Sequence, residues 1–196
     1  MMTPLDAKRA RPIEGGASFS LGNRLFRVFW MTCWLVLARF TPPPLHPWRR
    51  LVLQAFGARL GRNVRIHASV SIWHPANLQC EEHVLIGPGV RIYNQGQVTI
   101  GARTVISQRA HLCASTHNPN DPHFQLLLRP IHIGEQCWIA AEAFVGPGSM
   151  VKDRAILGAR ACLFGDAEAD GIYRGNPASF VKTRTLPAAP DDQKMR

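Results

Sequence analysis

Aliphatic residues recur at every sixth position over residues 133–168, and this pattern sets the expected fold. The stretch divides into six hexads whose first residues are Ile133, Ile139, Val145, Val151, Leu157 and Leu163. Their fifth residues are all small, namely Cys137, Ala143, Ser149, Ala155, Ala161 and Ala167. A period of six fits neither a helix nor a single strand. It predicts a parallel β-helix, in which the aliphatic residue points into a triangular prism, the small residue lies near a corner, and successive coils stack about 4.8 Å apart.

The same period continues upstream with two short slips. The hexads of coils one to three begin with Leu60, Ile66, Ile72, Cys80, Ile86, Ile92, Ile100, Ile106 and Leu112. Residues 133–168 supply coils four and five. Residues 118–130 interrupt the repeat, and loops that interrupt rigid scaffolds commonly carry function. We therefore predict an all-β fold class, with a β-helix of about five triangular coils forming a domain over residues 58–172.

Two amphipathic helices are expected ahead of the repeat, in a segment over residues 1–57. Residues 1–19 are polar and are predicted to be a flexible tail. Residues 20–40 are apolar and aromatic with flanking arginines, but their uncharged centre, residues 28–38, is shorter than the roughly 20 residues of a membrane span. This helix either lies in a membrane interface or packs on the prism or a neighbouring subunit, and both remain open. Prolines end it, and a second helix is expected over residues 46–56.

The chain end is expected to cap the other side of the prism. Residues 173–196 begin with a turn at Gly175, Asn176 and Pro177, and residues 178–185 are predicted to form a short C-terminal helix. The last residues, 187–196, are predicted to be disordered.

The charge and cysteine content limit which binding partners and which cellular compartment are expected. The formal net charge is +10, divided as +6 over residues 1–57, +1 over residues 58–172 and +3 over residues 173–196. A nearly neutral repeat body argues against nucleic acid as a partner, and basic ends suit an anionic membrane surface at one end and a phosphate ligand at the other. The five cysteines have no CxxC spacing, and no secretory signal opens the chain. We expect a reduced, cytoplasmic protein.

Several motifs together resemble the hexapeptide-repeat O-acetyltransferases, relatives of the galactoside and maltose acetyltransferases. These motifs are the hexads, Ala-Ser-Thr-His-Asn at 114–118, Trp-Ile-Ala-Ala-Glu-Ala-Phe-Val-Gly-Pro-Gly at 138–148 and Gly-Asn-Pro-Ala at 175–178. The Arg/Trp/Leu-rich N-terminal helix and the segments at 43–50 and 56–59 further resemble the colanic-acid biosynthesis branch. The resemblance covers roughly residues 18–184. It implies a left-handed β-helix, a homotrimer with sites between neighbouring prisms, acetyl-CoA as donor and a sugar hydroxyl as acceptor.

Within that resemblance, His117 is the predicted catalytic base, because an imidazole has a pKa near working pH. We expect the third coil to hold it rigidly at the mouth of the loop. Asn94, Asn118 and Asp121 are candidates for binding the acceptor sugar. Asn94 is equally well interpreted as a corner residue that satisfies the bulge after Ile92.

The resemblance also implies a donor site along coils four and five. Ala140, Ala141 and Ala159 match the positions beside pantetheine, and Ala140 replaces the more usual glycine. Trp138 lines this cleft, or else forms a hydrophobic corner or trimer contact. The turn at Gly175, Asn176 and Pro177 matches the adenine end. Lys182 and Arg184 are candidates for the CoA phosphates, with a merely solvated tail as the alternative.

The resulting prediction is an acetyltransferase that moves an acetyl group directly to a sugar or lipid-linked oligosaccharide in exopolysaccharide biosynthesis. It would work in the cytoplasm, at or near the inner face of the membrane, with no metal. Two alternatives stay open. One is a non-catalytic trimeric scaffold at the membrane. The other is a metalloenzyme similar to the γ-carbonic anhydrases, using His111, His117 and His123, although the spacing does not match that family.

Overall fold

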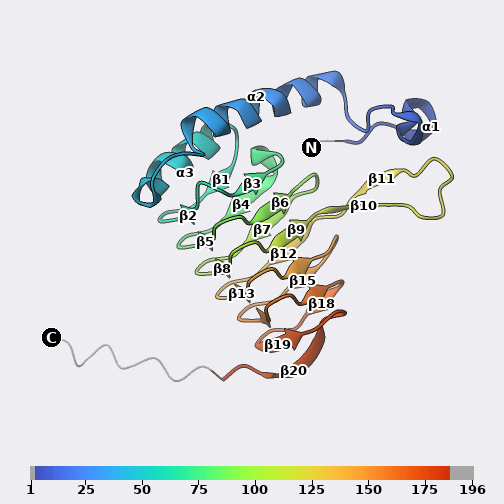
Figure 1. Ribbon diagram of the computed structural model, residues 1–196. Helices are drawn as coiled ribbons and strands as arrows, with labels where there is room; N and C mark the ends of the chain where they lie inside the picture. Colours follow the sequence, from blue (N-terminus) through green and yellow to red (C-terminus); the bar gives the residue numbers. More distant parts are fainter. Residues whose placement is uncertain (1–2, 186–196) are drawn as a thin grey trace.

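The computed structural model describes residues 3–185 and shows a triangular parallel β-helix with helices across one end (Figure 1). Residues 187–196, for which disorder is predicted, lie outside the described residues. The strands of the first three coils are β1 (Arg59–Leu60), β2 (Arg65–Ile66), β3 (Ser71–Ile72), β4 (Leu78–Cys80), β5 (Leu85–Ile86), β6 (Arg91–Tyr93), β7 (Val98–Ile100), β8 (Val105–Ile106) and β9 (His111–Cys113), with the 3-10 turn η3 (Pro75–Asn77) before β4.

A hairpin then leaves the prism, and two further coils follow. The hairpin consists of β10 (Ser115–His117) and β11 (Leu126–Leu128). Coils four and five consist of β12 (Ile131–Ile133), β13 (Trp138–Ile139), β14 (Phe144–Val145), β15 (Met150–Val151), β16 (Ile156–Leu157) and β17 (Cys162–Leu163). Two more strands, β18 (Asp166–Ala167) and β19 (Gly171–Arg174), begin a sixth coil.

Three parallel sheets form the prism faces, and their registers confirm the hexads. Sheet A has the order β1-β4-β7-β12-β15-β18, sheet C has β3-β6-β9-β14-β17, and sheet B has β2-β5-β8-β13-β16-β19 followed by one antiparallel strand. The first residue of every hexad in the five complete coils is buried and aligned with its equivalent in a neighbouring coil, as in Ile86, Ile106 and Ile139 of sheet B. The stacked aliphatic side chains are the core, because no single coil can bury its own.

The last hexad departs from the prediction. Ala167 was expected at a corner, but it pairs with Val151 in sheet A, where the aligned core residues lie. The chain reaches this position two residues early, so the last side of coil five is shortened. The other small fifth-position residues are buried, as predicted for a tight corner.

The helices replace the coil that is missing above coil one. Within the prism, the carbonyl of each aligned core residue accepts a backbone N–H from the coil before it, as Cys80 O does from Gly61 N. Coil one has no such neighbour, and side chains of helices α2 (Leu21–Leu37) and α3 (His46–Ala55) donate instead. Gln54 Nε2 donates to Leu60 O at 3.1 Å, Arg49 Nε to Ile66 O at 2.6 Å, and Trp30 Nε1 to Ile72 O at 2.8 Å. At least one side chain therefore caps each of the three sheets.

Arg49 shows how completely this end is closed. Its side chain has no exposed surface, and its guanidinium also donates to Thr41 Oγ1, Pro42 O and Pro43 O, the last two flanking the start of the 3-10 turn η2 (Pro43–Leu45). A buried charge is tolerated only when it is hydrogen-bonded. The sequence left open whether the first helix packs on the prism, and this packing is now observed through Trp30, Trp34 and Ala38.

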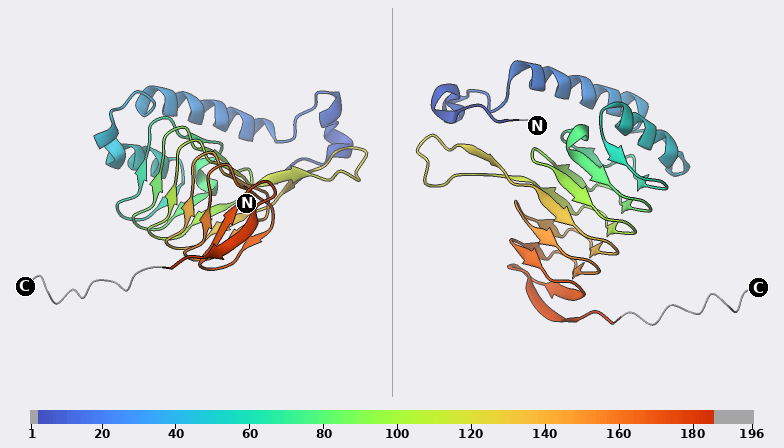
Figure 2. Two further views of the ribbon diagram at one scale, coloured as in Figure 1. Left: turned by 60° about the horizontal axis from the view of Figure 1, so that its bottom comes forward. Right: turned by 180° about the vertical axis from the view of Figure 1, so that it is seen from behind.

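The segment predicted as a flexible tail is instead folded. Residues 3–19 contain α1 (Ala7–Ala10) and the 3-10 turn η1 (Pro12–Glu14), and they lie beside the β10–β11 hairpin in both views of Figure 2. Phe19 is buried against the Trp73 ring, with the ring centroids 5.0 Å apart. The polar composition of this segment did not predict a fold, because the segment is held by hydrogen bonds to the distant hairpin rather than by a local apolar pattern.

The predicted C-terminal helix is wrong. Residues 179–183 form strand β20 (Ser179–Thr183), which pairs antiparallel with β19. The last strand of sheet B would otherwise present unpaired backbone N–H and C=O groups, and a further strand satisfies them where a helix does not.

Candidate active site

His117 lies on the hairpin, not on the coil. It is the last residue of β10 and pairs with Leu126 of β11, so antiparallel pairing holds it rather than the prism itself. The hairpin leaves the prism at the corner between sheets C and A, where the chain runs from β9 to β12. The expectation that coil three would hold His117 is therefore corrected, because the extended hairpin begins two residues earlier, at Ser115.

Phe124 fixes the imidazole in two ways. His117 Nδ1 lies 2.8 Å from Phe124 O, and the two rings stack with centroids 4.1 Å apart and planes 9° apart. A carbonyl oxygen only accepts, so Nδ1 carries a proton, and in the neutral ring Nε2 therefore has the free lone pair. The half-buried imidazole is thus an oriented proton acceptor.

Asn118 and Asp121 shape the tip of the same hairpin. Asn118 Oδ1 accepts from Asn120 N at 3.1 Å, and the two Asp121 carboxylate oxygens accept from His123 N at 2.9 Å and Gln125 N at 3.3 Å. Such side chain to backbone bonds are the usual means of holding a turn. Both residues stand within the His117 hairpin, and a role in binding the sugar stays a prediction.

Asn94 belongs to the prism interior. Its side chain has no exposed surface, its Oδ1 accepts from Trp73 N and His74 N, and its Nδ2 donates to His74 O. The bulge-satisfying interpretation is therefore the one that the contacts support. Asn94 has no surface left for an acceptor sugar.

The candidate donor residues form a line along one corner. Ala140 and Ala141 lie between β13 and β14, and Ala159 lies directly below them between β16 and β17, with Arg160 N donating to Ala141 O at 2.9 Å. The turn from Gly175 to Pro177 continues the corner, since Cys162 N donates to Gly175 O at 2.9 Å. The structure thus brings these predicted residues together where sheet B passes into sheet C.

The remaining donor candidates lie on the outer side of sheet B and at its far edge. Trp138 is 46% exposed, and its Nε1 donates to Ser107 Oγ at 2.9 Å. Arg184 NH1 donates to Gln136 O and Arg154 O, so part of its guanidinium already joins β20 to coils four and five. Lys182 is exposed on β20. A hollow on this face is lined by Arg103, Val105, Gln136, Cys137, Trp138 and Arg184.

No protein-family model matches the sequence. The chain is 37% identical over 166 residues, 85% of its length and 91% of the relative's, to the protein of Escherichia coli (strain K12) named as the colanic acid biosynthesis acetyltransferase WcaF. The chain belongs to the colanic acid biosynthesis acetyltransferase family. It is accordingly an acetyltransferase.

Solved structures agree on the fold of this colanic acid biosynthesis acetyltransferase family member. A hexapeptide-repeat containing acetyltransferase of Vibrio cholerae in complex with acetyl coenzyme A aligns with a TM-score of 0.77 at 16% identity, over 85% of this chain and 91% of that one. A galactoside acetyltransferase in complex with coenzyme A aligns with a TM-score of 0.74 at 18% identity, over 87% and 86%. At these identities the likeness establishes the β-helix architecture.

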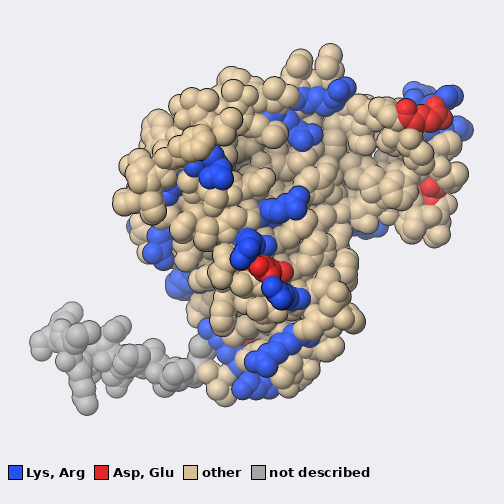
Figure 3. Space-filling model, in the orientation of Figure 1, with Lys and Arg blue, Asp and Glu red and all other residues tan. Residues whose placement is uncertain are grey.

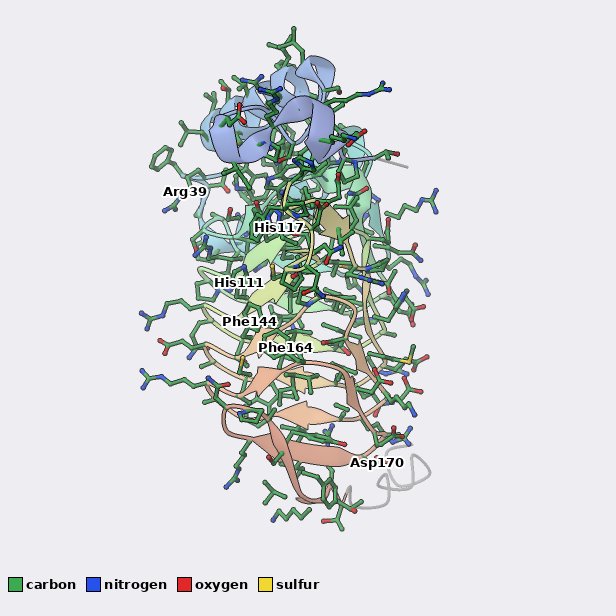
Figure 4. All side chains as sticks on the ribbon, turned by 90° about the vertical axis from the view of Figure 1, so that its right-hand side faces the viewer. Arg39, His111, His117, Phe144, Phe164 and Asp170 are labelled. Carbon is green, nitrogen blue, oxygen red and sulfur yellow. The ribbon has the colours of Figure 1, made fainter. Side chains whose placement is uncertain are left out.

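Sequence reasoning missed an aromatic strip on the outer side of sheet C, below the hairpin. His111 meets Phe144 edge to face at 5.3 Å, and Phe144 lies 5.5 Å from Phe164 (Figure 4). Burial, with a smaller effect of Arg91, lowers the pKa of His111. The sequence signal that could have located His111 in this row is its alternation with Leu112 along β9, which places it on the outer side of the sheet.

Sequence reasoning also missed Phe124 and Gln125, which no periodic signal marks.

For the metalloenzyme alternative, residues 3–185 of a single chain contain no group of three His, Cys, Asp or Glu side chains able to hold a metal ion. All five cysteines are free. None of the helices in the described part of the chain has the length and apolar character needed to span a membrane.

Proposed function

We propose that the protein transfers an acetyl group from acetyl-CoA to a sugar hydroxyl in exopolysaccharide biosynthesis, with His117 as general base. The observation that carries this proposal is the contact between His117 Nδ1 and Phe124 O, which leaves Nε2 with its lone pair on a half-buried ring. A general base must be fixed in direction, and this contact orients the imidazole and sets the tautomer of its neutral form. The names of the similar proteins, a colanic acid biosynthesis acetyltransferase and a galactoside acetyltransferase, support a saccharide acceptor.

The transfer needs one base and no covalent enzyme intermediate. Nε2 takes the proton of the sugar hydroxyl as the hydroxyl oxygen attacks the thioester carbonyl carbon. The tetrahedral intermediate collapses, the carbon–sulfur bond breaks, and the CoA thiolate takes the proton from Nε2. The products are the acetyl ester and CoA, and His117 returns to its starting state. Such proton transfer typically contributes about 10²–10⁴-fold to the rate.

We also propose a homotrimer, because one chain does not bring the two halves of the site together. The His117 hairpin leaves at the edge that sheet C shares with sheet A, whereas Ala141 and Ala159 lie at the edge that sheet C shares with sheet B. The width of sheet C separates them within a chain. A second prism packed at this face supplies the missing half, and the exposed Phe164 of the aromatic strip suits such a contact.

Donor binding is proposed along the Ala141 and Ala159 corner. Small side chains there allow the amides of pantetheine to approach the backbone, and the exposed turn from Gly175 to Pro177 follows directly below. Lys182 is the better candidate for a CoA phosphate, since Arg184 is committed to two carbonyl groups. Association with the inner face of the cytoplasmic membrane is proposed as well, on the basis of the exposed apolar side chains of α2.

The test compares His117→Asn with His123→Asn in cells that lack the chromosomal gene. Asparagine retains an N–H donor for Phe124 O, but its amide cannot act as a base near neutral pH. His123 serves as the control because it is an exposed neighbour on the same hairpin. Mass spectrometry of the exopolysaccharide should show O-acetyl groups with the wild type and His123→Asn, and their loss with His117→Asn. Acetylation that persists in His117→Asn contradicts the assigned base. Purified protein that fails to bind acetyl-CoA in calorimetry supports the scaffold alternative instead.

A further inference from the structure

Helix α2 has two apolar faces, and only one of them is covered. Trp30 and Trp34 of the inner face pack on coil one. The opposite face carries a row at helical spacing that is more than half exposed, including Leu25 at 61%, Phe29 at 61% and Val36 at 72%. A row of this length is unusual on a protein surface unless something covers it. We call it the outer face of α2; its members are Leu21, Leu25, Val28, Phe29, Leu35 and Val36.

The charge around this face has one sign. Between Gly15 and Cys80 the sequence contains eight arginines and no aspartate or glutamate. Arg24 and Arg39 are exposed near the two ends of α2. In Figure 3 the surface over α2 is tan with blue groups beside it, and the nearest red groups lie beside α1, which itself contains no acidic residue. Apolar residues bordered by arginines match the headgroup region of an anionic bilayer, where acyl chains meet phosphates.

A groove beside the outer face strengthens this match. It lies between α2 and coil one, with Val28, Met31, Trp34, Leu35 and Ile72 supplying apolar walls and Arg39 at its side. Arg39 lies at the helical end of the molecule, above His117 in Figure 4. The groove can receive an acyl chain while the guanidinium meets its phosphate. A second protein chain would leave the surplus of arginines without partners unless its own surface were acidic.

The same helical layer is joined to the His117 hairpin. Gln125 Oε1 accepts from Ala7 N at 2.7 Å, and Gln125 Nε2 donates to Leu5 O at 3.2 Å. Leu5 N donates to Ser18 O, two residues before Ser20, the N-cap of α2. Gln125 follows Phe124, which holds the imidazole. A continuous path of contacts therefore runs from α2 to the predicted base, and α1 lies beside the hairpin in Figures 1 and 2.

We propose that the outer face of α2 docks on an anionic bilayer, and that the hairpin, clamped to this layer by Gln125, acetylates saccharides anchored in that bilayer by a lipid. The assignment of the acceptor rests on the proposed function, whereas the docking does not. A docked α2 fixes the height of the hairpin above the lipid surface. Sugars linked to a membrane lipid are then held at high local concentration beside His117, which a freely diffusing sugar is not.

Docking is tested by flotation of the full chain with vesicles of phosphatidylcholine alone or with phosphatidylglycerol. We expect binding to the anionic vesicles that weakens with salt and falls at least about tenfold in Leu25→Ser/Val36→Ser, since two apolar side chains no longer enter the lipid. Met150→Ser/Val181→Ser removes two exposed apolar side chains away from α2, at 44% and 49%, and should float like the wild type. Equal binding to neutral vesicles overturns the proposal. So does a Leu25→Ser/Val36→Ser variant that loses only self-association.

The clamp is tested by amide hydrogen exchange with and without anionic vesicles. Vesicles should slow exchange in both α2 and the hairpin of the wild type. In Gln125→Ala the slowing should persist in α2 and disappear from residues 115–128, whereas Gln79→Ala, on the outer side of sheet A, should behave like the wild type. Slowing in the hairpin that survives Gln125→Ala overturns the clamp.

The acceptor class is tested with radiolabelled acetyl-CoA added to membranes or to soluble extract of the producing cells. Label should enter the lipid-extractable fraction of the membranes and fall at least about tenfold with Leu25→Ser/Val36→Ser. Label that enters water-soluble sugars at the same rate overturns the acceptor assignment. Flotation and exchange need no acetyl transfer, so their failure counts against docking alone. Docking without any labelled product counts against the proposed function and the acceptor assigned through it.

Discussion

The prism and the β10–β11 hairpin hold their residues by different means. In the prism every strand after coil one pairs in parallel with a strand of the coil before it, and the same position recurs in coil after coil, as Ile106 and Ile139 do. The hairpin pairs once, antiparallel, and its shape depends on single side chains: Asp121 at its tip, Phe124 against His117 and Gln125 against the N-terminal segment. Stability should therefore reside in the prism and chemistry in the hairpin, and substitutions should separate the two.

The largest effect is expected for Ile139→Ala in the prism. Ile139 is fully buried in the stacked core of sheet B, and removing its methylene and methyl groups leaves a cavity that neighbouring coils cannot close. We expect the free energy of unfolding to fall by about 2–5 kcal/mol. Leu127→Ala in the hairpin should cost less than about 1 kcal/mol. Denaturant titration measures the free energy of unfolding of both variants. Equal decreases in the two would contradict the assignment of stability to the prism.

A large effect on turnover without one on stability is expected for Phe124→Ala. The carbonyl remains available to His117 Nδ1, but the ring that restrains the imidazole is gone. Misplacing a base by about 1 Å costs on the order of 100-fold in rate, so we expect kcat to fall about ten- to hundredfold. Phe124→Tyr keeps the ring and should restore turnover. A melting temperature that falls together with kcat in Phe124→Ala would show that the hairpin supports the fold.

A smaller, donor-specific effect is expected for Ala159→Leu. The side chain is exposed at the corner proposed for pantetheine, so leucine should leave the fold intact while obstructing the donor. We expect the Kd for acetyl-CoA to rise about tenfold, equivalent to about 1.4 kcal/mol. Ala169→Leu places the same side chain at the corner between sheets A and B and should bind acetyl-CoA like the wild type. Calorimetry with unchanged affinity in Ala159→Leu would remove this corner from the donor site.

The smallest effect is expected for Asp170→Asn and depends on pH. Arg154 donates two hydrogen bonds at 2.7 Å to the Asp170 carboxylate, and these bonds hold its pKa below the usual value. A carboxyl pKa that is lower in the folded state stabilises the protein above the unfolded pKa of about 3.9, and that stabilisation is lost as pH falls through the folded pKa. Asp170→Asn should lower the melting temperature slightly at pH 6 and show a weaker decrease between pH 4 and pH 2. An identical pH profile would indicate that solvent screens the pair completely.

The hexad pattern predicted the coils because a repeated fold repeats its constraint. Cys80 could be placed in the core without being aliphatic, since its position in the series was fixed by Leu60 and Ile100 on either side. The same pattern located the interruption, and with it His117. It could not show that Ser115 already leaves the coil, because one antiparallel pair carries no period.

The remaining errors share a physical cause: each depends on what ends a repeat. Asn94 is buried because backbone groups of Trp73 and His74, at the end of coil one, need partners, a requirement visible only once those two residues are placed. Residues 179–183 form a strand because β19 would otherwise be an edge. The N-terminal segment is folded because it forms hydrogen bonds with Gln125, which is more than a hundred residues away in sequence.

The capped ends of the prism also govern how the molecule behaves towards copies of itself. A stack of identical coils has no intrinsic length, and a bare end offers three rows of backbone donors and acceptors to any strand that arrives. Gln54, Arg49 and Trp30 occupy one carbonyl per sheet at the first end, and β20 covers sheet B at the other. By occupying these backbone groups, the three side chains and the one strand oppose end-to-end stacking of molecules into a fibre.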